Sequence, residues 1–564
     1  MKFIVMKKTI LFRFSIAFTA LLFLSSCGLD LMVSKFNTLE YTVTPTQVEV
    51  HGGVIDIELD VNIPKKYFQK NASAEFRPML AESAESENKV FFEPVQLQGE
   101  KVSSNGKTIG YVTGGKFTYK GSVNYTDDMF AYDLFATATA TMNDNSKYLG
   151  SLKIADGVMA TATRVKNNEE PKFADHTYEK ETILEETAVI YFTVNNSTVR
   201  YSQKSSDEVK RLKEFAKQGF KTKNIEISSY ASPEGSLDVN DKVSGNRAKS
   251  TFSYAKRLMK DLKVDGANND ELYINTSKGE DWNGFNNLVN SSDLKDKSRV
   301  LNIVRSQKDP QKREEAIRDM AEIYDAIEED VLPKLRKATI TLRVYEPKKT
   351  DEEIASLAIS DPSKLDKKEM LYAATLLNDN SIKKTIYKAT INAHPNDYRA
   401  YNNLLCINII EKDFNSAKMN LGKAEKLGSN ASEVNENKGI MAAMEGDLES
   451  ANSLYNKSGA SNLNKGILAI KMGNYESAVS KLKGDDFNAT LAKILNGTNA
   501  TTSDKSAEGY YLNAISNTRS GSVDSAIENL RQAINLDANL AKEAAKDVEF
   551  LKLKDNTDFQ SLVN

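Results

Sequence analysis

Three different spacings of hydrophobic and polar residues follow one another along the chain. In the first part, apolar residues occupy every second position of one stretch: Ile55, Ile57, Leu59, Val61 and Ile63. A period of two places this apolar set on one face of a β-strand. Dipeptides that favour tight hairpins lie around such stretches: Gly52-Gly53, Asn105-Gly106 and Gly114-Gly115. We therefore expect an all-β immunoglobulin-like sandwich over residues 27–185.

The spacing changes from Ala188 onward. An alternating strand at 189–194 leads into a helix near 206–219, a second strand around Ile225 and another helix over 247–262. This β-α-β-α order predicts a packed α/β layer over residues 186–347. Helical material over about 280–335 interrupts the layer before a last alternating strand at 338–345. We expect this insertion to cap the domain, with the single tryptophan, Trp282, as an anchor in its core.

Residues 348–564 are helical in pattern and repeat at a period of 34 before the register slips. Small residues recur at corresponding positions, and Gly446, Gly473 and Gly521 mark turns between helices. The pattern resembles tetratricopeptide repeats, which implies an α-helical solenoid with a concave surface for peptides or partner proteins. Cys406 lies on a predicted first helix beside two leucines, where we expect a small buried residue.

The α/β part carries a second resemblance. Its motif residues are Tyr191-Phe192, Asn196, the stretch 229–235 (Ser-Tyr-Ala-Ser-Pro-Glu-Gly), Asn240, Ser244 and Arg247-Ala248. They resemble the C-terminal peptidoglycan-associating domain of the OmpA family, over roughly residues 188–345. The resemblance implies capture of a cell-wall peptide, with an arginine fork on its carboxylate and an acid near its ammonium. The candidate peptidoglycan-peptide site is Arg247, Asn240, Ser232, Glu234 and Tyr230.

This sequence departs from the family at the acid. Ser232 stands where the family carries aspartate, and the nearest carboxylate is Glu234. Two roles therefore stay open for Arg247. It binds a ligand carboxylate, or it is a structural residue, either solvated in the first turn of its helix or paired with Glu234.

The N-terminus predicts a location. Lys7 and Lys8 precede an apolar stretch at 11–23, which is the pattern of a secretory signal peptide. The tetrapeptide at 24–27, Leu-Ser-Ser-Cys, resembles a bacterial lipobox. The resemblance implies a signal peptide over 1–26 and acylation of Cys27, with the outer membrane as the protein's lipid-anchored location. The residues after Cys27 lack the lysine and clustered acids of a surface-export signal, which favours the periplasmic side.

The composition of the chain argues against several classes of function. The 564 residues have a formal net charge of -3 and a pI near 6.0, which gives no electrostatic case for binding nucleic acid. Only three histidines occur, and no motif for a metal, a nucleotide or a catalytic nucleophile accompanies them. We expect no enzyme activity, no metal and no cofactor. With Cys27 acylated, Cys406 has no cysteine in the chain to pair with.

Together these features resemble an OmpA-like domain lipoprotein with tetratricopeptide-like repeats, of the kind found in Bacteroidetes. The expected function is a non-catalytic scaffold for an envelope assembly, secretion or fimbrial complex. Its expected partners are the membrane, proteins bound through the helical repeats and, as a further candidate, peptidoglycan. The alternative is a cell-wall or glycan ligand-binding or processing factor that uses the OmpA-like pocket.

Overall fold

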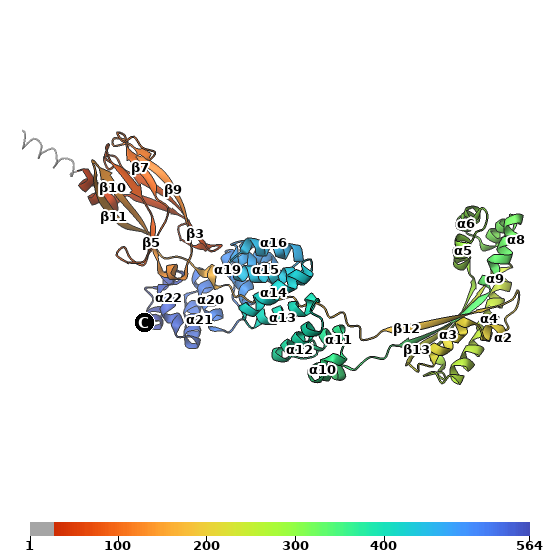
Figure 1. Cartoon of the computed structure of the whole chain (residues 1–564). Helices are drawn as coiled ribbons and strands as arrows, with labels where there is room; N and C mark the ends of the chain where they lie inside the picture. The colour runs from red at the N-terminus through yellow and green to blue at the C-terminus, as the bar shows by residue number, and fades with distance from the viewer. Residues whose placement is uncertain (1–27) are drawn as a thin grey trace, which may run out of the picture. The chain divides into compact units, whose positions relative to one another are not determined.

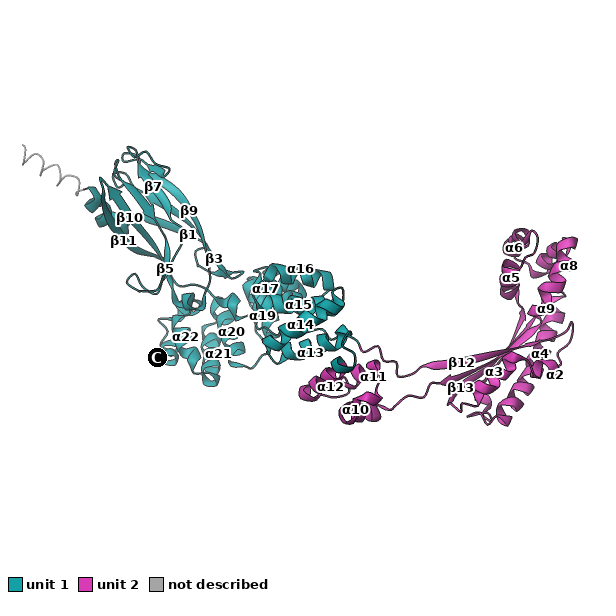
Figure 2. Ribbon diagram, viewed as in Figure 1, with its two compact units in different colours: residues 1–175, 391–564 teal, residues 176–390 magenta. Residues whose placement is uncertain are grey.

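The computed structural model describes residues 28–564, so Cys27 and the predicted signal peptide lie outside the described residues. The chain forms two compact units (Figure 2). The first combines the residues up to 175 with residues 391–564, and the second contains residues 176–390. Among the described helices, none has the length and apolar character needed to cross a membrane.

The first unit begins with two β-sheets that share one hydrophobic core (Figure 1). One sheet is antiparallel and has the order β1-β3-β2, with β9 also paired to β3. Its strands are β1 (Glu40–Thr44), β2 (Val50–His51), β3 (Val54–Ile63) and β9 (Gly115–Asn124). The other sheet has the order β6-β5-β10-β4-β7-β8, with β11 on β10. Its strands are β4 (Ser73–Phe76), β5 (Met79–Ala81), β6 (Lys89–Phe91), β7 (Val95–Gly99), β8 (Lys107–Ile109), β10 (Asp133–Met142) and β11 (Asn145–Ala155).

The alternating stretch forms β3 as predicted, and all five of its apolar residues are buried. Gly52 and Gly53 both have positive φ in the β2–β3 turn, which confirms that hairpin. The predicted hairpin at Asn105-Gly106 is wrong, because β7 and β8 are parallel and Gly106 does not have positive φ. Instead, the side-chain oxygen of Gln98 accepts the N–H groups of Ser104 and Gly106, and this holds the loop that brings β8 back alongside β7.

The predicted β domain extends too far toward residue 185. The last strand of the sandwich ends at Ala155, and a short 3-10 helix, η3 (Thr161–Arg164), follows it. Residues 165–175, here called the strap, form neither helix nor strand. Their backbone groups pair with side chains of the helical part of the same unit, as described below. The backbone of the strap therefore pairs with side chains of the helices and not with a neighbouring strand.

The second unit holds a four-stranded sheet of order β12-β15-β13-β14. Only the β13–β14 pair is parallel. The strands are β12 (Ile183–Tyr191), β13 (Thr222–Ala231), β14 (Tyr273–Glu280) and β15 (Lys337–Tyr345). Helices α2 (Tyr201–Lys204), α3 (Asp207–Ala216) and α4 (Leu237–Asp261) complete the predicted α/β layer. Apolar residues of α3 and α4 share a core with those of the sheet. The predicted boundary at 185/186 falls inside β12.

The insertion has a hydrophobic core of its own. It consists of α5 (Trp282–Ser291), α6 (Lys297–Ser306), α7 (Pro310–Arg318), α8 (Ala321–Asp330) and α9 (Leu332–Leu335). Trp282 packs edge-on against Phe285, with ring centroids 5.5 Å apart, and Arg313 lies over its indole. Trp282 is thus half-buried and packs against the core of the insertion, as the sequence indicated.

Helical residues after 350 divide between the units. The second unit contains α10 (Asp351–Ser360), α11 (Lys367–Ala373) and most of α12 (Asn380–Ala393). The first contains α13 (Tyr398–Ile410), α14 (Phe414–Gly428), α15 (Ser432–Met444), α16 (Leu448–Ser458), α17 (Asn462–Lys471), α18 (Tyr475–Lys481), α19 (Phe487–Leu495), α20 (Ala507–Arg519), α21 (Val523–Leu536), α22 (Asn539–Lys546) and α23 (Thr557–Val563). Consecutive helices pack as pairs, and the predicted turn glycines have positive φ. This array resembles a tetratricopeptide solenoid.

Candidate functional site

The helical array of the first unit binds the strap through a row of buried asparagines. Each asparagine side chain accepts a hydrogen bond from one strap N–H and donates one to the C=O of the same residue. The four pairs, with those two distances, are Asn403 with Ala174 (2.6 and 3.1 Å), Asn437 with Lys172 (2.8 and 2.9 Å), Asn464 with Glu170 (2.9 and 2.9 Å) and Asn488 with Lys166 (2.9 and 2.8 Å). We call this row the asparagine ladder. Its hydrogen bonds to the strap go to backbone groups, except that Asn488 also donates to the side-chain oxygen of Asn168 at 2.7 Å.

The ladder asparagines lie on α13, α15, α17 and α19, and the strap crosses these helices in the reverse order of the chain. The paired strap residues all have even numbers. In an extended chain every second residue turns its backbone groups to the same side, so one row of side chains can reach them all. Pro171, which has no N–H, occupies an unpaired position between two paired ones. The strap sequence therefore fits the ladder without a lost hydrogen bond.

Three ion pairs accompany the backbone pairing. Lys166 Nζ lies 2.5 Å from a carboxylate oxygen of Asp504. Lys471 Nζ lies 2.7 Å from Glu169, whose side chain is only 1% exposed. Lys172 lies 3.5 Å from the buried carboxylate of Glu436. The strap thus presents a basic, an acidic and a basic side chain at steps of three residues, opposite an acidic, a basic and an acidic group of the helices.

Cys406 is fully buried, as expected, and it also contacts the strap. Its Sγ lies 3.2 Å from the carbonyl oxygen of Lys172, and Asn437 donates to the same sulfur at 3.2 Å. Burial raises the pKa of the thiol well above its usual value. The residue therefore belongs to the floor of the strap site.

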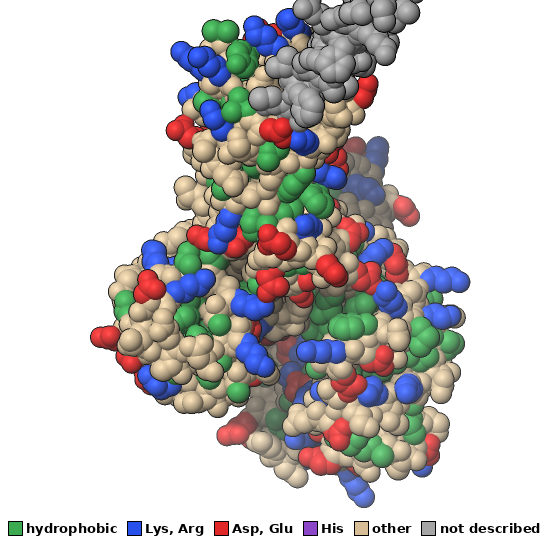
Figure 3. All heavy atoms as spheres, turned by 90° about the vertical axis from the view of Figure 1, so that its left-hand side faces the viewer, with side chains coloured by type: hydrophobic (Ala, Val, Ile, Leu, Met, Phe, Trp, Pro, Cys, Tyr) green, Lys and Arg blue, Asp and Glu red, His purple; other side chains and the backbone are tan. Residues whose placement is uncertain are grey.

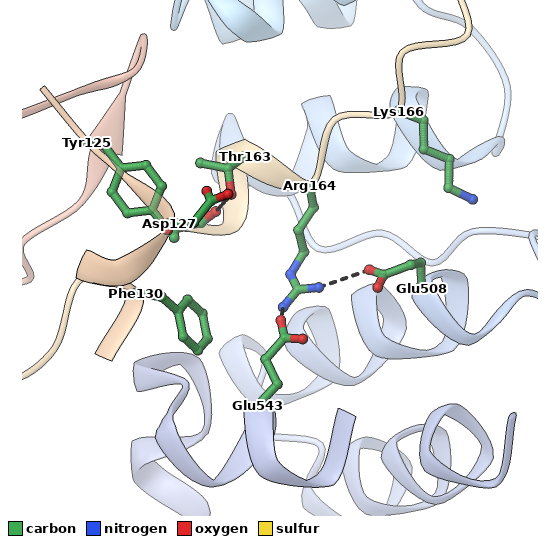
Figure 4. Close-up of a pocket in the computed structure, with 9 residues that line it drawn as sticks. Tyr125, Asp127, Phe130, Thr163, Arg164, Lys166, Glu508 and Glu543 are labelled. Atoms are coloured by element: carbon green, nitrogen blue, oxygen red, sulfur yellow. Dashed lines mark hydrogen bonds and ion pairs between the residues drawn. The ribbon is translucent and has the colours of Figure 1, made fainter. Parts of the chain in front are cut away.

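A cavity of about 430 Å³ lies where the sandwich, η3 and the last helices meet (Figure 4). Tyr125 and Phe130 line it from the sandwich side. Arg164 points toward Glu508, at 2.9 Å, and toward Glu543. The guanidinium of Arg164 also lies 4.0 Å from the ring centroid of Tyr511. These contacts hold the start of the strap against the helices.

A buried acid beside Arg164 has a raised pKa. Asp547 accepts a hydrogen bond from Tyr511 Oη at 2.8 Å and lies 3.6 Å from Arg164. Burial raises the pKa of Asp547 to about 6, and Arg164 opposes that shift. A proton on this carboxyl group is therefore linked to the stability of the sandwich–helix junction.

Arg247 is neither a solvated first-turn residue nor the ion-pair partner of Glu234. It lies in the third turn of α4 rather than the first, and it is 2% exposed. Its three donor nitrogens bond to backbone carbonyls of Asn196 (3.0 Å), Tyr230 (2.9 Å) and Thr193 (3.3 Å). Burial lowers its pKa to about 10, and the nearby Arg336 adds to that effect. The guanidinium fastens the loop after β12 to the end of β13.

Glu234 pairs with Arg336, not with Arg247. The pair is bidentate, with both N···O distances 2.7 Å, and the Ser232 hydroxyl donates to the same carboxylate at 2.7 Å. Asn240 donates to the Gly235 carbonyl at 3.1 Å and to Glu280 at 2.8 Å. Lys337 lies over the ring of Tyr230, 5.3 Å from its centroid. Four of the predicted site residues thus form hydrogen bonds or an ion pair within the unit, and Tyr230 packs beneath a lysine.

The strap and its ladder were not predicted from the sequence. The available signal was an asparagine recurring in successive first helices, at 403, 437, 464 and 488. The first spacing equals the repeat period, but the later ones are shorter, so the row is not visible as a strict repeat. Elsewhere in the described part of the chain, no cluster of His, Cys, Asp or Glu is arranged to hold a metal.

No protein-family model matches the chain, and no curated protein is similar to it. Similar solved structures include YrrB, a TPR protein with an unusual peptide-binding site, at 14% identity and a TM-score of 0.21, covering 31% of this chain and 88% of that chain. The APC/C hetero-tetramer Cut9-Hcn1 matches at 13% identity and a TM-score of 0.27, covering 58% of this chain and 76% of that chain. The type IV pilus biogenesis factor PilW matches at 14% identity and a TM-score of 0.20, covering 39% of this chain and 100% of that chain. These TM-scores are too low to indicate a function for this chain.

Proposed function

We propose that the protein is a non-catalytic scaffold that is lipid-anchored to the outer membrane through Cys27, faces the periplasm and serves an envelope assembly, secretion or fimbrial complex. The observation that carries the proposal is the asparagine ladder. A row of buried side chains that pairs with polypeptide backbone is suited to holding protein segments and has no catalytic group of its own.

The arrangement of the first unit supports a structural role. The strap joins the sandwich to the helical array by backbone pairing and ion pairs at many points along its length. Thr161 adds a hydrogen bond to the buried carboxylate of Glu549 at the junction. A lipid-anchored sandwich fixed in this way would hold the array at the membrane as one body. On the face shown in Figure 3, basic and acidic side chains are interspersed, which fits protein contacts better than binding to a polyanion.

For residues 186–347 we propose an OmpA-like domain that has kept its fold and lost the wall ligand. The β-α-β-α order supports the fold. The contacts of Arg247 argue against ligand capture, because a wall-derived carboxylate would have to displace three backbone carbonyls from the guanidinium. Glu234, the candidate replacement for the family's aspartate, is already neutralised by Arg336.

The test is affinity purification of the lipidated protein from detergent-extracted membranes, followed by mass spectrometry. The scaffold proposal expects a stoichiometric protein partner. In parallel, the purified protein is sedimented with isolated peptidoglycan. Retention on the wall together with the absence of any protein partner would overturn the scaffold proposal and favour the ligand-binding alternative.

A further inference from the structure

The strap has the features of a bound ligand as well as those of a linker. Only Glu169 and Ala174 of residues 165–175 are buried, and the side chains of Asn167, Glu170 and Phe173 are exposed. Apart from Val165 at its start, which packs against the core of the helical array, and the small buried Ala174, it is held by hydrogen bonds and ion pairs rather than by apolar contacts. Polar contacts exchange with water on release, so their net contribution to stability is modest. Because the strap has no helix or strand of its own, it can leave without unfolding one.

The surface of the helical array that carries the ladder and is covered by the strap, here called the groove, accepts the strap in one register only. Between Glu170 and Ala174 every second residue pairs with the ladder, so in this stretch backbone pairing alone would not distinguish the observed register from one shifted by two residues. The ion pairs would not be preserved. A slip by two would move Glu169 away from Lys471, and it would leave the buried Glu436 without Lys172. Burying an unpaired charge is costly, so the three charged positions set the register.

We propose that this groove is a peptide-binding site and that residues 165–175 occupy it as a ligand in cis. Its ligand class is an extended peptide with a basic, an acidic and a basic residue at positions i, i+3 and i+6. Such a segment of a partner would have to displace the strap before it could bind. This inference deepens the proposed scaffold function, on which it rests, by naming the chemistry of the partner segment and the device that excludes it.

Covalent attachment explains why the strap would exclude weak ligands. A tethered segment has an effective concentration on the order of millimolar at its own site. A partner present at micromolar concentration therefore competes only if it binds more tightly or if the strap is weakened. Weakening the strap should therefore expose the groove to a peptide added in trans, and this can be measured.

The probe is a fluorescent synthetic peptide of residues 163–175, and binding is measured by anisotropy on the full chain in detergent. The strap of the receiving chain carries Glu169→Lys and Lys172→Glu, which oppose Lys471 and Glu436. We expect this variant to bind the peptide at least tenfold more tightly than the wild-type chain does. A peptide carrying the same two reversals should bind neither chain. Adding Asn437→Ala and Asn464→Ala to the variant should abolish binding.

The matched control is Glu170→Lys. It makes the same charge change at the neighbouring residue, whose side chain is exposed, and should leave peptide binding at the wild-type level. Unchanged binding by the double-reversal variant, with its helical circular dichroism intact, would overturn the proposal. The strap would then be an integral part of the fold.

A second measurement uses the wild-type chain, so it does not depend on the variant folding. Hydrogen exchange should show the amides of residues 166, 170, 172 and 174 opening at least tenfold more often than those of α15 and α17. If both sets of amides exchange only when the whole unit unfolds, the strap does not leave the groove by itself and the proposal is refuted.

The peptide-site proposal and the scaffold proposal can fail separately. A partner that co-purifies although the peptide never binds refutes only the peptide site, and a peptide that binds although no partner co-purifies refutes only the scaffold.

Discussion

Asn464 pairs with both backbone groups of Glu170: its Oδ1 accepts the N–H and its Nδ2 donates to the C=O, each at 2.9 Å. The same Nδ2 also donates to Glu436 at 3.0 Å. A carboxamide used in this way replaces the neighbouring strand that an extended chain would otherwise need. This relationship, repeated along the ladder, allows the strap to be ordered without belonging to a sheet.

Asn464→Ala should loosen the strap at its centre. The change leaves the N–H and C=O of Glu170 without their partner, which costs roughly 1–3 kcal/mol. Urea unfolding of the full chain, followed by helical circular dichroism, should show the loss, and limited proteolysis should cut within residues 165–175 more readily. Asn456→Ala is the control, because Asn456 is exposed on α16. Equal effects of the two substitutions would contradict a specific role for the ladder.

Asp547 should make the first unit less stable as pH rises. Its folded-state pKa of about 6 lies above the ordinary value of about 3.9, so the folded state favours the protonated acid. The stabilisation is complete below about pH 4 and is lost as pH rises through about 6; a shift of about two units corresponds to roughly 3 kcal/mol. We therefore expect the free energy of unfolding of Asp547→Asn, relative to wild type, to improve from pH 4 to pH 7.

The control for that experiment is Asp524→Asn, which removes an exposed acid from α21. Its difference from wild type should stay constant over the same range. Parallel pH curves for wild type and Asp547→Asn would show that the buried carboxyl group does not titrate between pH 4 and 7.

Arg247→Ala should act on stability. Three carbonyl oxygens lose a charged donor, and hydrogen bonds to charged groups contribute roughly 1.5–3 kcal/mol each, so we expect a loss of several kcal/mol in the second unit. Thermal unfolding is the measurement, and Arg257→Ala, an exposed arginine of the same helix, is the control. Sedimentation with peptidoglycan should be equally low for all three proteins. Wall binding by wild type that Arg247→Ala abolishes without altering the melting temperature would restore the ligand-binding role.

Ala451→Leu should disturb the helical array. Ala451 is fully buried on α16 and shares a core with residues of α13 and α15. Extra methylene groups in a packed core cost typically 1–3 kcal/mol. A lower melting temperature is expected, whereas Ser453→Leu, at an exposed position of the same helix, should have little effect. Indifference to both changes would contradict the helix packing described here.

Cys27→Ala should release the protein from the membrane fraction or leave it unprocessed, because acyl chains are the only strong membrane-binding group that the sequence predicts. Cys406→Ala provides the control, since it removes the other cysteine of the chain. Fractionation and immunoblotting distinguish the variants. Normal leader cleavage with full membrane retention in Cys27→Ala would exclude lipid anchoring, provided that retention persists after partner proteins are stripped with high salt.

Local periodicity allowed much of the fold to be predicted. Residues close in sequence predicted β3, the α/β order, the helix pairs with their turn glycines, the packing of the half-buried Trp282 and the burial of Cys406. The parallel pairing of β7 with β8 could not be predicted, because it depends on how Gln98 holds a loop. The Asn105-Gly106 dipeptide favoured a hairpin for reasons that hold only when the two flanking strands are antiparallel neighbours.

The candidate site shows the same limit more clearly. A motif resemblance identified Arg247 and Glu234, but the partner of Glu234 is Arg336, which lies 102 residues away in sequence. The strap could not be predicted for a different reason. Recognition through backbone groups imposes no period on the strap's own side chains, so residues 165–175 have no hydrophobic pattern to detect.

The ladder pairs join residues that are 229 to 322 positions apart in the chain. During synthesis, the sandwich and strap emerge first, the whole inserted unit follows, and the helices carrying the asparagines come last. The strap must therefore wait without its partners while more than 200 residues are made. Contacts of such long range are slow to form. The order of synthesis thus leaves the nascent chain with an open, unpaired segment, and a truncation before residue 403, which removes all four ladder asparagines, would make that transient state permanent.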